Sequence, residues 1–239
     1  MPTLEETLKR LAITFTVSDI MIPETRLVCA GDEIEAAQVS KDNPDFNVIP
    51  IRLNGRLTGY FERDSHITSQ IALNDLISDG TSLLDLVETF EDREFSFVLS
   101  HRQISGYVHY SDLNHHLLKL SFYVILEALE RQVLSSIRRN DDREYLSRNL
   151  DPSRFAQIAQ QYKRDGDAAR SLFNYLNISD ILRLAVKAGT IQIDDDVIKA
   201  MKKARDEAAH ASENIVADYR AVNRLAKVKR ECLRILSAA

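Results

Sequence analysis

The feature that most constrains the fold is a repeat within the first half of the chain. The sequence GDEI at 31–34 is matched by GTSL at 80–83, an offset of 49 residues, and the apolar segment DFNVIPI is matched by EFSFVL at the same offset. LTGYF, which contains Gly59, is matched by ISGYV, which contains Gly106, at an offset of 47. Each copy predicts a strand, a helix, an apolar strand, a hairpin and a further strand. A unit that recurs in this way usually packs against its copy, because neither buries its apolar face alone.

The offset between the copies falls from 49 to 47 residues at the hairpin turn, because the second copy has a shorter turn. Asn54-Gly55 between apolar segments is a strong hairpin signal, and its counterpart in the second copy is the tighter SHRQ. VSDIM, the helix start GDEI and VIPIRLNGRLTGYFERD together resemble a CBS domain, and the second copy resembles its partner. The resemblance covers about residues 14–112 and implies an adenosine-type regulatory ligand, held in a cleft between the repeats, with no metal and no required cofactor.

The resemblance also assigns ligand contacts. The family signature is glycine, two apolar residues, Ser or Thr, two variable residues and a ribose-binding Asp. In the second repeat it covers Gly106 to Asp112, with His109 at the hydroxyl position; in the first repeat Asp64 comes one residue early and Glu62 takes the hydroxyl position. The ligand-binding residues that the resemblance implies are Asp112, His109, Gly106, Asp64 and Ile49.

Two roles are open for Asp112. Its carboxylate could accept hydrogen bonds from both ribose hydroxyls, or it could cap a long helix that we expect to begin at Leu113; the two roles can coexist. Glu62 would repel a phosphate. The acidic character of this half argues against a triphosphate unless a cation enters the cleft from Arg52, Arg56 or Arg102. A nucleoside, a monophosphate or a short oligonucleotide is therefore favoured over ATP.

The charge of the chain divides near residue 112. Residues 1–112 carry 9 Lys and Arg against 19 Asp and Glu, a net charge of −10, and residues 113–239 carry 22 against 17, a net charge of +5. This asymmetry suggests either that one half meets a polyanion or that two unrelated domains adjoin. Two cysteines 203 positions apart, without CxxC spacing, argue against a disulfide framework or a zinc site, and no apolar run is long enough for a membrane span. We expect a cytoplasmic protein.

The second half predicts a bundle of four or five helices, so that the whole chain is α+β, with a CBS-type domain at 1–112 and a helical domain at 113–239. The first helix carries the apolar stripe Phe122, Leu126, Leu129 and Val133. A second helix begins after Asp151, and a third apolar segment spans 172–186. The last two helices begin after the acidic triplet 194–196 and at Asp218.

The fourth helix carries a motif that the apolar pattern does not explain. Its core-facing stripe is Val197, Met201, Ala204, Ala208, Ala211 and Ile215. Arg205 and His210 fall on the opposite side, and Asp206 stands four residues before His210, where its carboxylate could orient the imidazole. ARDEAAH resembles the Arg-polar-x-x-x-His motif of HEPN domains, although the residue after the arginine is most often Asn in that family. The resemblance covers about residues 113–239.

The HEPN resemblance implies a metal-independent endoribonuclease. The 2′-hydroxyl of RNA would attack the adjacent phosphate, with His210 moving the proton and Arg205 stabilising the charge. Because these side chains diverge around one helix, a compact site is more easily built across the two-fold axis of a homodimer. The expected RNA contacts are Lys199, Lys202, Arg220, Arg224 and Lys227. The rival hypothesis is a ligand-binding regulatory protein whose helical domain binds a protein or nucleic acid without cleavage.

Overall fold

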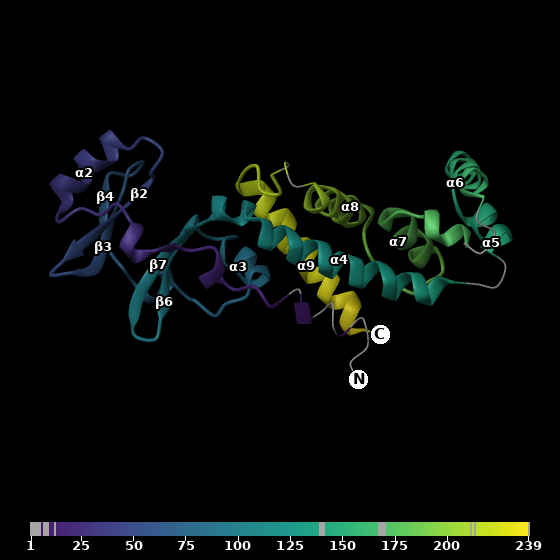
Figure 1. Ribbon diagram of the computed structural model, residues 1–239, viewed down its shortest axis with the longest axis horizontal. Coiled ribbons are helices and arrows are strands. Elements are labelled where there is room, and N and C mark those ends of the chain that lie inside the picture. Colours follow the sequence, from purple (N-terminus) through teal and green to yellow (C-terminus); the bar gives the residue numbers. More distant parts are fainter. Residues whose placement is uncertain are drawn as a thin grey trace. The chain divides into compact units, whose positions relative to one another are not determined.

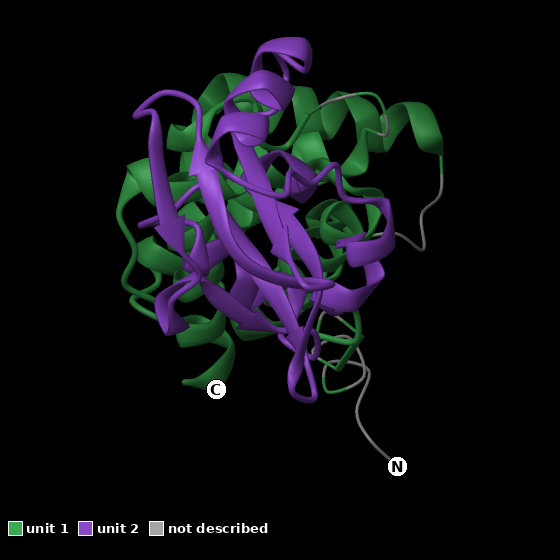
Figure 2. Ribbon diagram, turned by 90° about the vertical axis from the view of Figure 1, so that its left-hand side faces the viewer, with its two compact units in different colours: residues 1–15, 114–239 green, residues 16–113 purple. Residues whose placement is uncertain are grey.

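The computed structural model describes residues 6, 10–11, 13–138, 142–166, 171–210, 212 and 214–238. The chain forms two compact units, shown in purple and green in Figure 2. The first is Thr16–Leu113, which we name the repeat unit. The second, the helical unit, combines Asn114–Ala239 with Met1–Phe15.

The repeat unit contains all the strands that the structure describes, and its two copies have the same element order (Figure 1). The elements of the first copy are β1 (Ile22–Pro23), α2 (Glu33–Asp42), β2 (Val48–Leu53) and β3 (Arg56–Glu62), followed by β4 (Ile67–Gln70). Those of the second copy are β5 (Leu76–Ser78), α3 (Leu83–Thr89), β6 (Phe95–Ser100) and β7 (Gln103–His109). The predicted strand–helix–strand–hairpin repeat is confirmed, as is the α+β class.

Each hairpin is extended by a strand from outside its own copy: β4, between the two copies, pairs with β3, and β1 pairs with β7. The two sheets have the orders β2-β3-β4 and β1-β7-β6-β5, so β1 of the first copy pairs with the second hairpin. Gly59 and Gly106 make these pairings possible. A Cβ at Gly59 would lie 2.7 Å from the carbonyl oxygen of Ser69, and one at Gly106 would lie 2.7 Å from that of Ile22. The repeated glycines therefore allow a neighbouring backbone to approach.

The two hairpins share an irregularity as well. Pairing of β2 with β3 passes from Ile51–Gly59 to Arg52–Leu57, and pairing of β6 with β7 passes from Val98–Gly106 to Leu99–Ile104. One residue is skipped in each case, directly before the glycine, which is a β-bulge. At the first turn Asn54 and Gly55 both have positive φ, as a type I′ hairpin requires.

Aromatic side chains from both copies form a shared core. Tyr60 of β3, Phe97 of β6 and Leu57 are buried together, with Phe95 and Tyr107 packed against them. The Tyr60 ring lies 5.7 Å from that of Phe97, which lies 5.7 Å from that of Tyr107. A second core beneath α2 consists of Ala30, Ala36, Ile49, Ile51 and Phe61.

The helical unit holds the longest of the described helices, α4 (His116–Ile137) and α9 (Tyr219–Ser237) (Figure 1). Its shorter helices are α5 (Asp142–Asn149), α6 (Pro152–Asp165), α7 (Ile178–Lys187) and α8 (Asp195–Ala209). Helix α4 packs against α7, α8 and α9. The predicted stripe of α4 is buried at Phe122, Leu126, Leu129 and Val133. No described helix is long and apolar enough to cross a membrane.

Three of the predicted helix limits are wrong. The long helix begins at His116, because a 3₁₀ turn at Tyr110–Asn114 comes first. The segment 172–186 is divided into a 3₁₀ turn at Leu172–Tyr175 and α7, which Asn177 caps. The fourth helix ends at Ala209 and does not continue to Ile215, although Ile215 is fully buried. The predicted core residue Ala211 lies outside the described residues.

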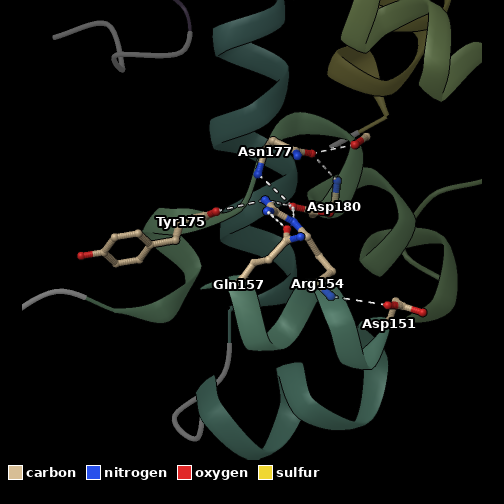
Figure 3. Close-up of polar contacts among 7 residues, drawn as sticks. Asp151, Arg154, Gln157, Tyr175, Asn177 and Asp180 are labelled. Carbon is tan, nitrogen blue, oxygen red and sulfur yellow. Dashed lines mark hydrogen bonds and ion pairs between the residues drawn. The ribbon is translucent and has the colours of Figure 1, made fainter. Parts of the chain in front are cut away.

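The starts and ends that rest on capping residues are confirmed. Asp151 caps α6, Gly166 follows α6 with a left-handed φ of 64°, and Asp218 caps α9. Figure 3 shows how α6 is fixed to α7. The Arg154 guanidinium of α6 donates to the Asp180 carboxylate at 2.7 and 2.9 Å, and that carboxylate also accepts from the backbone N–H of Asn177.

Candidate functional site

A cavity of about 420 Å³ lies within the repeat unit and is lined by both copies. The first copy contributes the start of β2, the end of β3 and the turn that follows. The second copy contributes the segment before β5, the segment before β6 and the end of β7. The lining residues are Asn47, Val48, Tyr60, Glu62, Asp64, Asn74, Asp75, Asp92, Arg93, Glu94, Phe95 and His109.

One wall of the cavity is aromatic. The rings of Tyr60 and Phe95 meet edge to face, with centroids 5.1 Å apart and an interplanar angle of 78°. Burial raises the pKa of Tyr60, and the negative charges of Asp75 and Glu62 raise it further. The phenol is therefore neutral at physiological pH and stands in a negative field. A flat aromatic or heterocyclic group could pack against this wall.

The rest of the lining is strongly acidic. Five carboxylates face one guanidinium, that of Arg93. Glu62 accepts a hydrogen bond from Ser65 and Asp75 accepts one from the backbone N–H of Ala72. Within the described part of the chain, no ion pair forms at any of the five. Arg52, one of the three cations considered for a phosphate contact, pairs with Glu24 at 2.5 Å. The carboxylates are Glu62, Asp64, Asp75, Asp92 and Glu94.

His109 contributes an imidazole of fixed protonation. Its Nδ1 accepts from the backbone N–H of Ser111 at 3.2 Å and lies 2.8 Å from the Ser111 hydroxyl. An acceptor at Nδ1 places the proton of the neutral ring on Nε2. Burial lowers the pKa of His109, while the charge of Asp112 acts in the opposite sense. His109 is thus a neutral donor at the edge of the cavity.

Asp112 closes a 3₁₀ turn, as two other aspartates in the repeat unit also do. Its carboxylate accepts from the backbone N–H of His109, three residues earlier, at 2.8 Å. Asp19 and Asp75 accept in the same way from the N–H groups of Thr16 and Ala72, also at 2.8 Å. All three close a 3₁₀ turn. Burial raises the pKa of Asp112, and the His109 N–H opposes that effect.

The predicted ligand residues divide between the cavity and its surroundings. His109 and Asp64 line the cavity. Asp112 closes the adjoining turn, and Gly106 admits the backbone of β1. Ile49 is fully buried in the core beneath α2 and does not line this cavity. Sequence reasoning missed Tyr60, Phe95 and Glu94. The repeated tyrosine of LTGYF and ISGYV was the available signal for the aromatic wall.

Comparisons with known proteins add one structural neighbour. No protein-family model matches the chain, and no curated protein matches it. Among solved structures, the chain is similar to the CBS domain of the bacterial CNNM/CorC family Mg²⁺ transporter in complex with ATP. The match has a TM-score of 0.38 and 10% sequence identity, and it covers 49% of this chain and 94% of that chain.

In the helical unit, the side chain of Arg205 is engaged with α4. Its guanidinium lies 5.6 Å from the centroid of the Tyr123 ring, a cation–π geometry. Glu130 of α4 has an Oε2 that is buried without a hydrogen-bond partner among the described residues. Burial raises the pKa of Glu130, and the positive charge of Arg205 acts against that effect. Arg205 therefore compensates a buried carboxylate.

The other two motif residues are separated from this contact. Asp206 pairs with Lys202 at 2.5 Å, four residues earlier, and not with His210 as the spacing predicted. His210 is exposed and follows the last residue of α8 in an extended conformation. Within the described residues, no hydrogen bond or ion pair joins His210 to Arg205 or Asp206. Within the described part of one chain, His210 and Arg205 are thus not joined in a single site.

The cationic side chains expected to bind RNA differ in whether they already form ion pairs within the chain. Lys199 pairs with Asp195 and Asp196, at 3.1 and 3.2 Å. Arg224 is mostly buried, pairs with Glu207 at 2.7 Å and donates to the carbonyl oxygen of Ile215. Arg220 and Lys227 are exposed on α9, and neither has an ion pair within the described ranges.

Proposed function

We propose that the chain is a ligand-binding regulatory protein, in which the repeat unit acts as a CBS-type sensor for an adenosine-type ligand. The cavity lined by both copies carries this proposal. Its volume, about 420 Å³, lies in the range of small-molecule sites. A ligand held there touches both repeats at once, so that its binding energy depends on how the two copies pack.

The lining suits the parts of a nucleoside. Tyr60 and Phe95 supply an aromatic wall for a base, and Asp64 and Glu62 supply acceptors for ribose hydroxyls. The neutral His109 has an N–H at Nε2 for a further acceptor. The same carboxylates repel a phosphate chain, so adenosine fits the lining better than a triphosphate does.

Calorimetric titration of the full chain tests this proposal. We expect adenosine to bind, Tyr60→Ala and Asp64→Asn each to weaken binding at least fivefold, and Glu33→Gln to leave it unchanged. Glu33 is an exposed carboxylate on α2 outside the cavity, so it controls for net charge. Absence of adenosine binding, or equal affinities in all these variants, would refute the sensor role.

For the helical unit, we propose a partner-binding role without cleavage. Arg205 supports it, because its charge compensates Glu130 and its side chain packs on Tyr123. The metal-independent endoribonuclease, its RNA substrate and the homodimer that would assemble the active site remain predictions.

One assay separates the two roles of the helical unit. Labelled single-stranded RNA is incubated with the full chain in EDTA, beside His210→Ala, Arg205→Ala and, as a matched control, His66→Ala in the repeat unit. Cleavage that His210→Ala and Arg205→Ala abolish and His66→Ala retains establishes the nuclease and overturns our proposal. Binding without cleavage, or no interaction, supports it; equal cleavage by all four proteins identifies a contaminant.

A further inference from the structure

The charge of the cavity lining narrows the class of ligand more than the shape of the cavity does. This inference rests on the proposed sensor function. Five carboxylates and one guanidinium line the cavity, a formal balance of −4. Surface carboxylates are commonly compensated by nearby Lys or Arg, as Asp195 is by Arg183 and Lys199 elsewhere in this chain. The cavity carboxylates form no ion pair within the described residues, with Arg93 or any other cation.

The aromatic wall is a separate observation that favours the same kind of ligand. The face of a Tyr or Phe ring carries partial negative charge and attracts an ammonium group within about 6 Å. Tyr60 and Phe95 line the cavity together with Glu62, Asp75 and Glu94. Burial raises the pKa of Tyr60, and the negative charges of Asp75 and Glu62 at this wall raise it further. Aromatic faces beside unpaired carboxylates are a suitable environment for an organic cation.

We propose that the cavity selects a positively charged ligand, namely a nucleoside derivative that carries an ammonium or comparable cationic group where a nucleotide carries phosphate. The nucleoside portion packs on the Tyr60–Phe95 wall. The cationic group lies among the carboxylates and removes their mutual repulsion. Ligands of the same shape are thereby ranked by charge: cation first, neutral molecule second, anion last.

Three compounds that share the adenosine skeleton isolate the effect of charge. They are 5′-amino-5′-deoxyadenosine, adenosine and adenosine 5′-monophosphate, and each is titrated calorimetrically into the full chain at pH 6.5 in low salt, where the amine is protonated. At an effective dielectric constant between those of protein and water, one added charge among several carboxylates changes affinity by about tenfold or more. We expect the amine to bind about tenfold more tightly than adenosine and the monophosphate about tenfold more weakly. Added salt should narrow both differences.

Variants test whether the cavity is the source of the preference. Glu94→Gln and Glu62→Gln should each lower the ratio of amine to adenosine affinity by about threefold, since each removes one cavity charge. Glu33→Gln removes the same charge from α2, outside the cavity, and should leave the ratio unchanged. A ratio that falls equally in all three variants overturns the proposal, because the preference would then reflect only the net charge of the protein.

The outcomes also distinguish this inference from the function on which it rests. Adenosine binding with no preference for the amine, or tighter binding of the monophosphate, overturns the charge selection and leaves the sensor role standing. Failure of all three compounds to bind refutes both.

Discussion

A single aspartate illustrates how much a motif can decide at the level of the residue. Asp112 matches the position of a ribose-binding carboxylate, yet Asp19 and Asp75 make the same hydrogen bond, to a backbone N–H three residues earlier. The sequence alone does not distinguish an aspartate that closes a turn from one that binds a ligand. Only the cavity lining separates them, and it includes Asp75 but not Asp112.

Replacing Asp112 tests its role in the turn. We expect Asp112→Ala to lower the free energy of unfolding by about 1 kcal/mol, because the N–H of His109 loses its acceptor. Asp112→Asn keeps an acceptor oxygen and should cost less than half as much. Urea denaturation measures both. A loss of adenosine affinity in Asp112→Asn without loss of stability would instead assign this carboxylate to the ligand.

The neutral imidazole of His109 predicts a pH dependence. Its pKa is lowered in the folded protein by burial, so below about pH 6.5 the unfolded chain takes up the proton more readily. The stability that depends on His109 is therefore complete above pH 6.5 and is lost as the pH falls through the lowered pKa. Urea midpoints between pH 7.5 and 5 should fall less steeply in His109→Gln than in the unaltered chain. Parallel curves would contradict this.

At the level of elements, the sequence correctly predicted the turns and helix starts that depend on a few neighbouring residues. The Asn54-Gly55 turn and the N-cap Asp151 each act within a few residues, and both are found in their expected roles. The end of α8 was mispredicted because Ile215 is buried by tertiary packing beyond the helix, which imitates one more helical turn. Periodicity alone cannot distinguish these cases.

Gly106 provides a test of the strand pairing. A Cβ at this position would lie 2.7 Å from the carbonyl oxygen of Ile22 and 2.8 Å from the sulfur of Met21, so we expect Gly106→Ala to destabilise the repeat unit by about 1–3 kcal/mol. Gly80→Ala is the matched control, since its Cβ would meet only the Ser78 hydroxyl, at 3.8 Å. Chemical denaturation compares the two. Equal stability of both variants would mean that β1 can move away at no cost.

The junction of α6 and α7 gives a second test at this level. The ion pair of Arg154 with Asp180 leaves these side chains only 26% and 10% exposed, and Asp180 also accepts from Asn177 (Figure 3). Arg154→Ala should therefore cost about 2–3 kcal/mol, because a largely buried carboxylate loses its partner. Arg148→Ala breaks an exposed pair with Glu144 and should cost less than about 0.5 kcal/mol. Thermal unfolding with matched denaturant curves distinguishes them.

At the level of the whole molecule, the sequence predicted two kinds of domain but not the site. The cavity is assembled from five separate segments of the repeat unit, and its carboxylates come from three of them: 62–64, 75 and 92–94. The net charge of −10 in residues 1–112 indicated an acidic domain without showing that five carboxylates converge on one aromatic wall. Such a site depends on how the two copies pack, which no local pattern specifies.

The separate cores of the two units predict how a ligand acts on the molecule. Leu84 and Phe97 are fully buried in the repeat unit, as are Phe122 and Met201 in the helical unit. We expect calorimetric unfolding of the full chain to show two transitions, of which adenosine raises only that of the repeat unit. At a ligand concentration 100 times Kd the stabilisation is about 2.7 kcal/mol, equivalent to about 10 °C for a domain of about 100 residues. Tyr60→Ala should abolish this shift and Arg205→Ala should retain it. If adenosine raises neither transition, or raises both equally in Tyr60→Ala, the cavity is not where the ligand binds.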